Sequence, residues 1–93
     1  MAVLVSSKVA GQTREGYDGV LMSVREHIKK APGFIVQSAY PVEDGWQVME
    51  VWKTKQDADH WYANHVVPYI PKGIHPKRSY QELYNVITPL EHF

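Results

Sequence analysis

The chain has 93 residues, with ten lysines and arginines balanced by ten aspartates and glutamates, and no cysteine. This length predicts one domain spanning residues 1–93, and a domain this small often needs a disulfide, a metal or a partner chain for stability. The lack of cysteine excludes disulfides and thiolate metal sites. The lack of a basic cluster argues against nucleic-acid binding.

The longest apolar run, residues 2–5, is far too short to span a membrane. No basic segment precedes it, as one would in a secretory signal peptide. We therefore expect a cytoplasmic protein that does not associate with a membrane.

Residues 2–9 are rich in β-branched side chains and predict the first strand. Thr13 has the hydroxyl of an N-cap residue, and residues 14–30 follow as a helix with one apolar stripe. That stripe consists of Tyr17, Val20, Leu21, Val24 and Ile28. The sequence Ala31-Pro32-Gly33 then ends the helix.

Residues 34–40 and 46–53 predict two strands, joined by a hairpin turn at Asp44-Gly45. Thr54 starts a second helix, which is expected to kink or tighten at Pro68 because proline has no backbone N–H. Residues 78–87 alternate as a fourth strand, and residues 88–93 form a tail. The inner stripe of the second helix is predicted to contain Ala58, Trp61, Tyr62, His65 and Tyr69.

The order βαββαβ favours an α+β fold of the ferredoxin-like type, a four-stranded antiparallel sheet with both helices on one face. In the third strand, Trp46 and Trp52 point to one face, whereas Met49 and Val51 point to the other. A sheet with one face in water would alternate apolar with polar residues. We therefore expect a second copy of the chain to cover the open face, which gives a homodimer.

Three stretches then resemble the antibiotic biosynthesis monooxygenase (ABM) family of the dimeric α+β barrel superfamily. These are Pro32-Gly33-Phe34, the run from Met49 to Lys55 that contains Glu50 and Trp52, and a helix with Ala58, Trp61 and His65 before Val66-Val67-Pro68-Tyr69. The resemblance covers nearly the whole chain and implies a ferredoxin-like βαββαβ sandwich that forms a dimeric α+β barrel. It also implies one of several activities, because some members oxidise anthrone-type polyketides with oxygen and no cofactor, whereas others bind and degrade haem.

Glu50 and His65 are the candidate catalytic residues. Glu50 lies beside aromatic side chains, where desolvation could make it a general base. The sequence favours a structural role instead, in a salt bridge or in a hydrogen bond to a helix terminus. His65 shares a helix face with Trp61 and Tyr69, so it could take a proton near neutral pH or ligate a haem iron. The alternative is a half-buried histidine bonded to a carbonyl or a tyrosine hydroxyl.

A flat aromatic pocket is expected around these two residues. Arg78 would pair either with an anionic substrate or with Glu50, and the sequence does not rank the two. For Trp61 and Tyr69, a place in the core is the interpretation that the sequence favours. The candidate substrate-binding residues are Trp61, Tyr62, Asn64, Tyr69, Trp52 and Arg78.

No metal site is expected, because His60 and His65 lie on different helix faces. The leading hypothesis is a homodimeric monooxygenase that needs no cofactor and acts on a planar phenolic or polyketide-like small molecule. The alternatives are a haem-binding or haem-degrading protein with His65 as axial ligand, a polyketide cyclase, and a dimeric ligand-binding module without catalysis.

Overall fold

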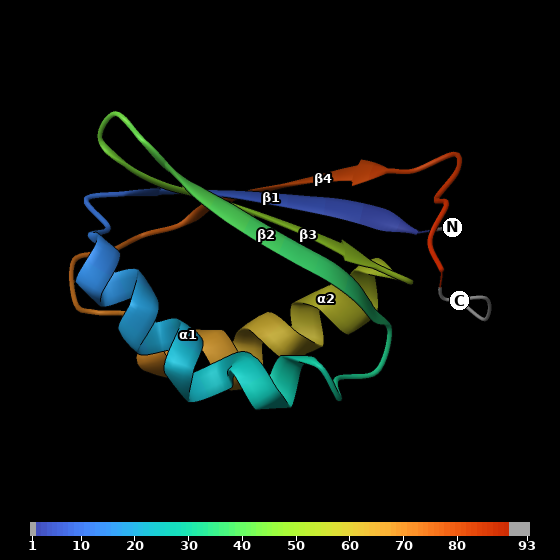
Figure 1. Cartoon of the computed structure of the whole chain (residues 1–93), viewed down its shortest axis with the longest axis horizontal. Coiled ribbons are helices and arrows are strands. Elements are labelled where there is room, and N and C mark those ends of the chain that lie inside the picture. The colour runs from blue at the N-terminus through green and yellow to red at the C-terminus, as the bar shows by residue number, and fades with distance from the viewer. Residues whose placement is uncertain (1, 90–93) are drawn as a thin grey trace.

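The computed structural model describes residues 2–89. The elements follow in the order β1 (Val3–Ala10), α1 (Arg14–Ile28), β2 (Phe34–Val42), β3 (Gly45–Trp52), α2 (Lys55–Trp61), η1 (Tyr62–Val66), η2 (Val67–Tyr69) and β4 (Lys77–Glu82). All strand pairs are antiparallel, and the sheet order is β2-β3-β1-β4. The helices lie together on one face of the sheet (Figure 1). The predicted ferredoxin-like βαββαβ sandwich is therefore confirmed.

The predicted caps form as expected. The Thr13 hydroxyl accepts a hydrogen bond from the Gly16 N–H at 3.1 Å, and the Thr54 hydroxyl accepts one from the Asp57 N–H at 3.0 Å. Each bond satisfies an N–H group that a helix start leaves without an intrahelical partner.

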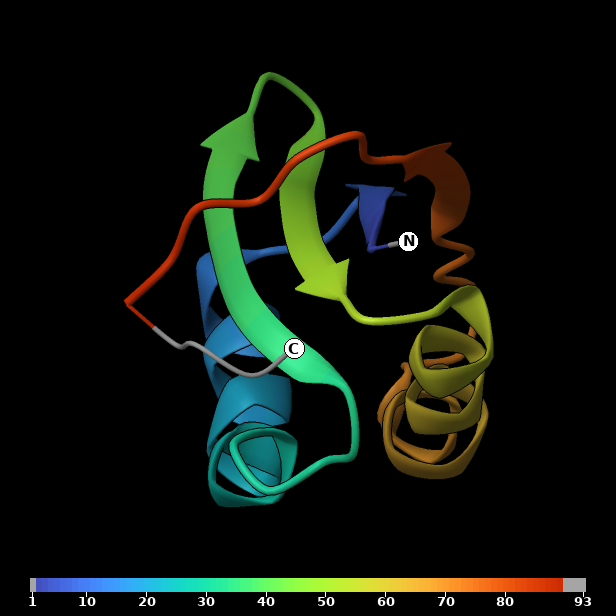
Figure 2. The same cartoon turned by 90° about the vertical axis from the view of Figure 1, so that its right-hand side faces the viewer.

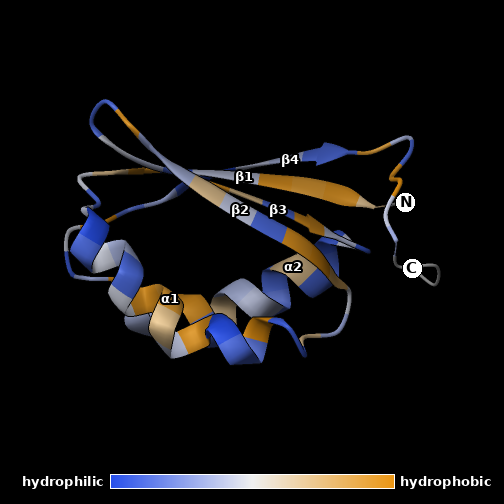
Figure 3. Cartoon of the chain, viewed as in Figure 1, coloured by the Kyte–Doolittle hydropathy of each residue, from blue (hydrophilic) through white to orange (hydrophobic). Residues whose placement is uncertain are grey.

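The core lies between the sheet and the helices. Val5 and Trp52, from neighbouring strands, are almost fully buried, and Val24 of α1 and Trp61 of α2 pack against the same cluster. Figure 3 shows the apolar stretches of the strands and of α1 on the two sides of this layer. Trp46, Val48 and Trp52 share the inner face, as their parity predicted, because their partners in β1 are the inward-facing Val9, Ser7 and Val3.

The second helix differs from the prediction after Trp61. The Val67 N–H donates to the Tyr62 carbonyl, five residues back, so η1 is a π-helical turn. A 3₁₀ turn follows at Pro68, which confirms the predicted tightening. A π turn inserts an extra residue and rotates the following side chains around the axis. Tyr69, expected on the inner stripe, is consequently 51% exposed.

The fourth strand is shorter than the predicted 78–87. After Glu82 the Leu83 N–H donates to the Ala2 carbonyl at 2.8 Å, and the chain then runs beyond the end of β1. Without a neighbouring strand the ladder stops, and Tyr84 and Ile87 are almost fully exposed. Figures 1 and 2 show this segment passing the ends of the strands rather than covering the open face of the sheet. Of the predicted tail, residues 90–93 lie outside the described residues.

Among residues 2–89, no helix has the length and apolar character needed to cross a membrane.

Candidate functional site

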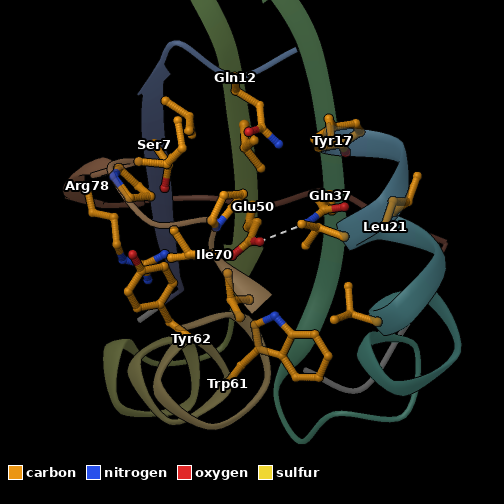
Figure 4. A pocket seen from close by; sticks show the side chains of 18 residues that line it. Ser7, Gln12, Tyr17, Leu21, Gln37, Glu50, Trp61, Tyr62, Ile70 and Arg78 are labelled. Carbon is orange, nitrogen blue, oxygen red and sulfur yellow. Dashed lines mark hydrogen bonds between the residues drawn. The ribbon is translucent and has the colours of Figure 1, made fainter. Parts of the chain in front are cut away.

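A cavity opens between the sheet and the helices, and we call it the main cavity (Figure 4). It holds about 690 Å³ of space between atoms, with its open mouth included. All four strands, α1 and the segment from Trp61 to Pro76 contribute to its wall. Most of the lining is aliphatic, but Ser7, Gln12, Gln37, Glu50 and Arg78 bring polar groups to it.

Glu50 lies in the wall of the main cavity, with only 6% of the residue exposed. Its carboxylate accepts two hydrogen bonds of 2.9 Å, one from Gln37 Nε2 and one from Trp52 Nε1. The strand geometry explains both, because Gln37 is the cross-strand partner of Glu50, and Trp52 is two residues further along the same face. Two donors on separate oxygens fix the carboxylate in position.

Arg78 enters the cavity from β4, where it stands opposite Ser7 of β1. Its guanidinium stacks on the Tyr62 ring at 3.8 Å from the centroid, and its Nε donates to the Tyr80 hydroxyl at 3.4 Å. Among the described residues, Nη2 is buried and finds no hydrogen-bond partner, and no ion pair joins Arg78 to Glu50. The arginine is therefore held in place by Tyr62 and Tyr80, and its buried Nη2 has no hydrogen-bond partner among the described residues.

The indole of Trp61 supplies a second unpaired donor. The residue is 3% exposed, and its Nε1 is buried without a hydrogen-bond partner among the described residues. Figure 4 shows the indole nitrogen on the side of the ring that faces Glu50. A buried N–H without a partner costs about 1–3 kcal/mol, so a ligand or water oxygen at this point would be stabilised.

Two tyrosines, Tyr17 and Tyr62, add hydroxyl groups to the lining of the main cavity. Burial raises the pKa of Tyr17, and the nearby Glu50 and Asp18 carboxylates raise it further. Burial also raises the pKa of Tyr62, although the positive charge of Arg78 acts in the opposite direction. Both hydroxyls are therefore protonated at neutral pH and available as donors.

A polar cluster ties α2 to β4 beside the main cavity. The Tyr80 hydroxyl donates to the Asp59 carboxylate, and Lys55 lies over the Tyr80 ring and pairs with Asp59 at 2.8 Å. Burial alone would raise the pKa of Asp59, but the hydrogen bonds from Lys55 and Tyr80 outweigh it, and the pKa lies below its usual range. This cluster fixes Tyr80, the neighbour against which Arg78 is oriented.

His65 does not lie in the main cavity. It lines a separate pocket of about 600 Å³, open mouth included, which we call the histidine pocket. There its ring stacks on Trp61 with centroids 4.4 Å apart and on His27 at 6.0 Å. The lining of this pocket is His27, Lys30, Ala31, Pro32, Asp57, His60, Trp61 and His65.

The structure thus places the two candidate catalytic residues, Glu50 and His65, in different pockets. One cavity was expected to be lined by Trp61, Tyr62, Asn64 and His65. Of these four, Trp61 and Tyr62 line the main cavity. Asn64 is exposed and its amide donates to the His60 carbonyl at 2.8 Å. The π turn explains this, because it changes the helical register between Trp61 and the residues after it.

Trp52 and Tyr69 also lie outside the lining of the main cavity. Trp52 is fully buried and acts on the site through its bond to Glu50 and through its ring contact with Trp61. Sequence reasoning did not select Tyr17 or Gln37. Tyr17 had been assigned to the apolar stripe of the first helix, and the sequence around Gln37 carries no signal of its contact with Glu50.

No cluster of three or more histidine, aspartate or glutamate side chains suited to a metal ion exists within residues 2–89.

Neither a protein-family model nor a curated protein matches the sequence. Solved structures do match. SnoaB from Streptomyces nogalater, described as a cofactor-independent oxygenase, has a TM-score of 0.68 at 10% identity, over 92% of this chain and 96% of that chain. The monooxygenase ActVA-Orf6 from Streptomyces coelicolor, solved with nanaomycin D, has a TM-score of 0.58 at 21% identity, over 96% and 92%.

A candidate antibiotic biosynthesis monooxygenase from Bacillus cereus matches with a TM-score of 0.50 at 14% identity, over 98% of each chain. At these identities the likeness concerns the fold. The chain therefore has the fold of an ABM-type domain, as the sequence resemblance predicted.

Proposed function

We propose that the chain is a monooxygenase that oxidises a planar phenolic or polyketide-like small molecule in the main cavity, without a cofactor. One observation supports this most strongly. A buried carboxylate, Glu50, borders the main cavity together with Trp61 and Arg78, each of which has a buried N–H donor without a partner among the described residues. Such a cavity suits a ligand with apolar faces and oxygen atoms at its edge.

Deprotonation of the substrate needs a proton acceptor and donors that stabilise the resulting negative charge, and the polar groups of the main cavity can fill both roles. Glu50 accepts a proton from an acidic C–H or phenolic O–H of the substrate, because each carboxylate oxygen retains acceptor capacity beyond its one bond. Arg78 and Trp61 donate to the oxygen on which negative charge develops. This assignment gives Glu50 the role of base that the sequence had suggested for His65, since His65 lies outside the main cavity.

The overall reaction balances without a redox cofactor. The deprotonated, electron-rich substrate transfers electrons to molecular oxygen, and a new C–O bond forms at the carbon that lost the proton. Loss of the second hydrogen and cleavage of the O–O bond convert a methylene and O₂ into a carbonyl and water. The substrate loses four electrons and O₂ gains four. The description of SnoaB as a cofactor-independent oxygenase supports this chemistry for the fold.

We also propose that the protein is a homodimer through the open face of the sheet. Val36 and Tyr40 are about half exposed on this face, and Met49 and Val51 extend the apolar surface across β3. A surface of this kind is normally covered by a partner. Sedimentation at micromolar concentration is expected to give the mass of two chains, and a monomer would contradict this part of the proposal.

Oxygen consumption tests the proposed reaction. The purified protein, checked spectroscopically for flavin and haem, is expected to consume one O₂ for each anthrone converted to a quinone. Ring closure of an uncyclised polyketide chain, without oxygen uptake, would instead indicate a cyclase. Binding of the anthrone without turnover would indicate a ligand-binding module, and a Soret shift on addition of haem would indicate a haem protein. Each of these three results would contradict the proposed monooxygenase.

A further inference from the structure

Trp61 forms the boundary between the two pockets. It is a lining residue of both the main cavity and the histidine pocket. Its indole nitrogen faces Glu50 on the main-cavity side (Figure 4). His65, which stacks on the indole ring, lines the histidine pocket and not the main cavity. The position of one ring therefore decides both the size of the main cavity and the direction of an unpaired N–H donor.

Two aromatic contacts hold that ring. Trp52, from the core, lies 6.2 Å away at an interplanar angle of 34°, and His65 stacks almost parallel at 4.4 Å and 18°. His65 in turn stacks on His27 of α1 at 6.0 Å and 22°. The row His27–His65–Trp61 thus links α1 to the cavity wall through ring contacts alone.

We propose that His65 is a positioning residue that holds Trp61 in the orientation needed to close the main cavity and to present its N–H to a bound oxygen. The inference rests on the proposed function for its consequence in catalysis, but not for its structural content. Without the His65 ring, the indole gains room on the side of the histidine pocket and can turn away from Glu50.

Several groups other than His65 face the histidine pocket, and they define the controls. His27 approaches from α1, Lys30 from the turn that follows α1, and Asp57 and His60 from α2. Of these, His60 is exposed and makes no ring contact with Trp61 among the described residues. His60→Ala therefore removes a histidine from the same pocket and leaves the ring contacts among His27, His65 and Trp61 unchanged.

The test compares His65→Ala with His65→Phe, which keeps an aromatic ring, and with His60→Ala. The first readout is the indole ¹H–¹⁵N NMR signal of Trp61, assigned by its loss in Trp61→Phe. The second is the affinity for a dihydroxyanthraquinone probe. We expect His65→Ala to shift or broaden the indole signal and to weaken binding about three- to tenfold, the range for one aromatic contact. His65→Phe should restore both, and His60→Ala should change neither.

An unchanged Trp61 signal in His65→Ala would overturn the inference, and so would an equal effect of His60→Ala or a failure of His65→Phe to restore the signal. The NMR readout does not require a ligand. If the probe fails to bind the wild-type protein while the indole signal responds as expected, the proposed function fails and the positioning role stands.

Discussion

Replacing Glu50 by glutamine tests the carboxylate at the centre of the site with almost no change in shape. Trp52 Nε1 can only donate, so the new amide oxygen must face it. The new amide nitrogen then faces Gln37, which can rotate its own amide to offer its oxygen. Both hydrogen bonds therefore survive in E50Q, but between neutral groups.

The expected loss of stability is small. A hydrogen bond to a charged group contributes about 1.5–3 kcal/mol and a neutral one about 0.5–1.5 kcal/mol, so two exchanges cost roughly 2 kcal/mol. The lower desolvation cost of a buried amide, compared with a carboxylate, offsets part of this. We expect the free energy of unfolding to fall by no more than about 2 kcal/mol. The rate should fall further, by about 10²–10⁴-fold, because the proton acceptor is lost.

Urea unfolding followed by tryptophan fluorescence measures the first quantity, and oxygen uptake with an anthrone measures the second. Glu43→Gln, at an exposed position between β2 and β3, is the matched control and should change neither. Folded E50Q that consumes oxygen at the wild-type rate would refute the role of Glu50 as the base. A stability loss above about 4 kcal/mol would refute the described hydrogen-bond exchange.

Three further changes have defined outcomes. Arg78→Met removes the Nη2 donor and the stacking on Tyr62. Affinity for dihydroxyanthraquinone, measured by fluorescence titration, should therefore fall about tenfold or more. A change below about twofold would count against the site. Tyr17→Phe should make the free energy of unfolding less sensitive to alkali. Because the pKa of Tyr17 is raised in the folded state, wild-type stability falls as the pH rises above about 10. Equal slopes of unfolding free energy against pH for both proteins, measured by urea unfolding, would contradict this. Gly33→Ala should lower the free energy of unfolding, measured by urea unfolding, by about 1–3 kcal/mol. The reason is that φ is +83° and a Cβ would overlap the Asp57 side chain. Unchanged stability would show that this turn is not constrained.

Local signals in the sequence were sufficient for the fold. Thr13 and Thr54 mark the helix starts, the parity of Trp46, Val48 and Trp52 places them on one face of β3, and Pro68 marks the tightened turn. Each of these depends on a residue and its near neighbours, so propensity and periodicity are enough to predict it.

The candidate site was predicted only in part, for two physical reasons. A helical wheel assumes a constant 3.6 residues per turn, and the π turn after Trp61 breaks that assumption, which removes Asn64 and Tyr69 from the predicted pocket. The environment of Glu50 depends on β2–β3 register, which brings Gln37 beside it from thirteen residues away. The short-range patterns used to predict the elements do not report such a contact.

A crystal structure with bound dihydroxyanthraquinone would locate the substrate site. We expect the ring system to lie in the main cavity, with ligand oxygens within hydrogen-bond distance of Arg78 Nη2 and Trp61 Nε1, and with Glu50 facing a ligand hydroxyl. A ligand in the histidine pocket, or a main cavity that stays without ligand at saturating concentration, would contradict it.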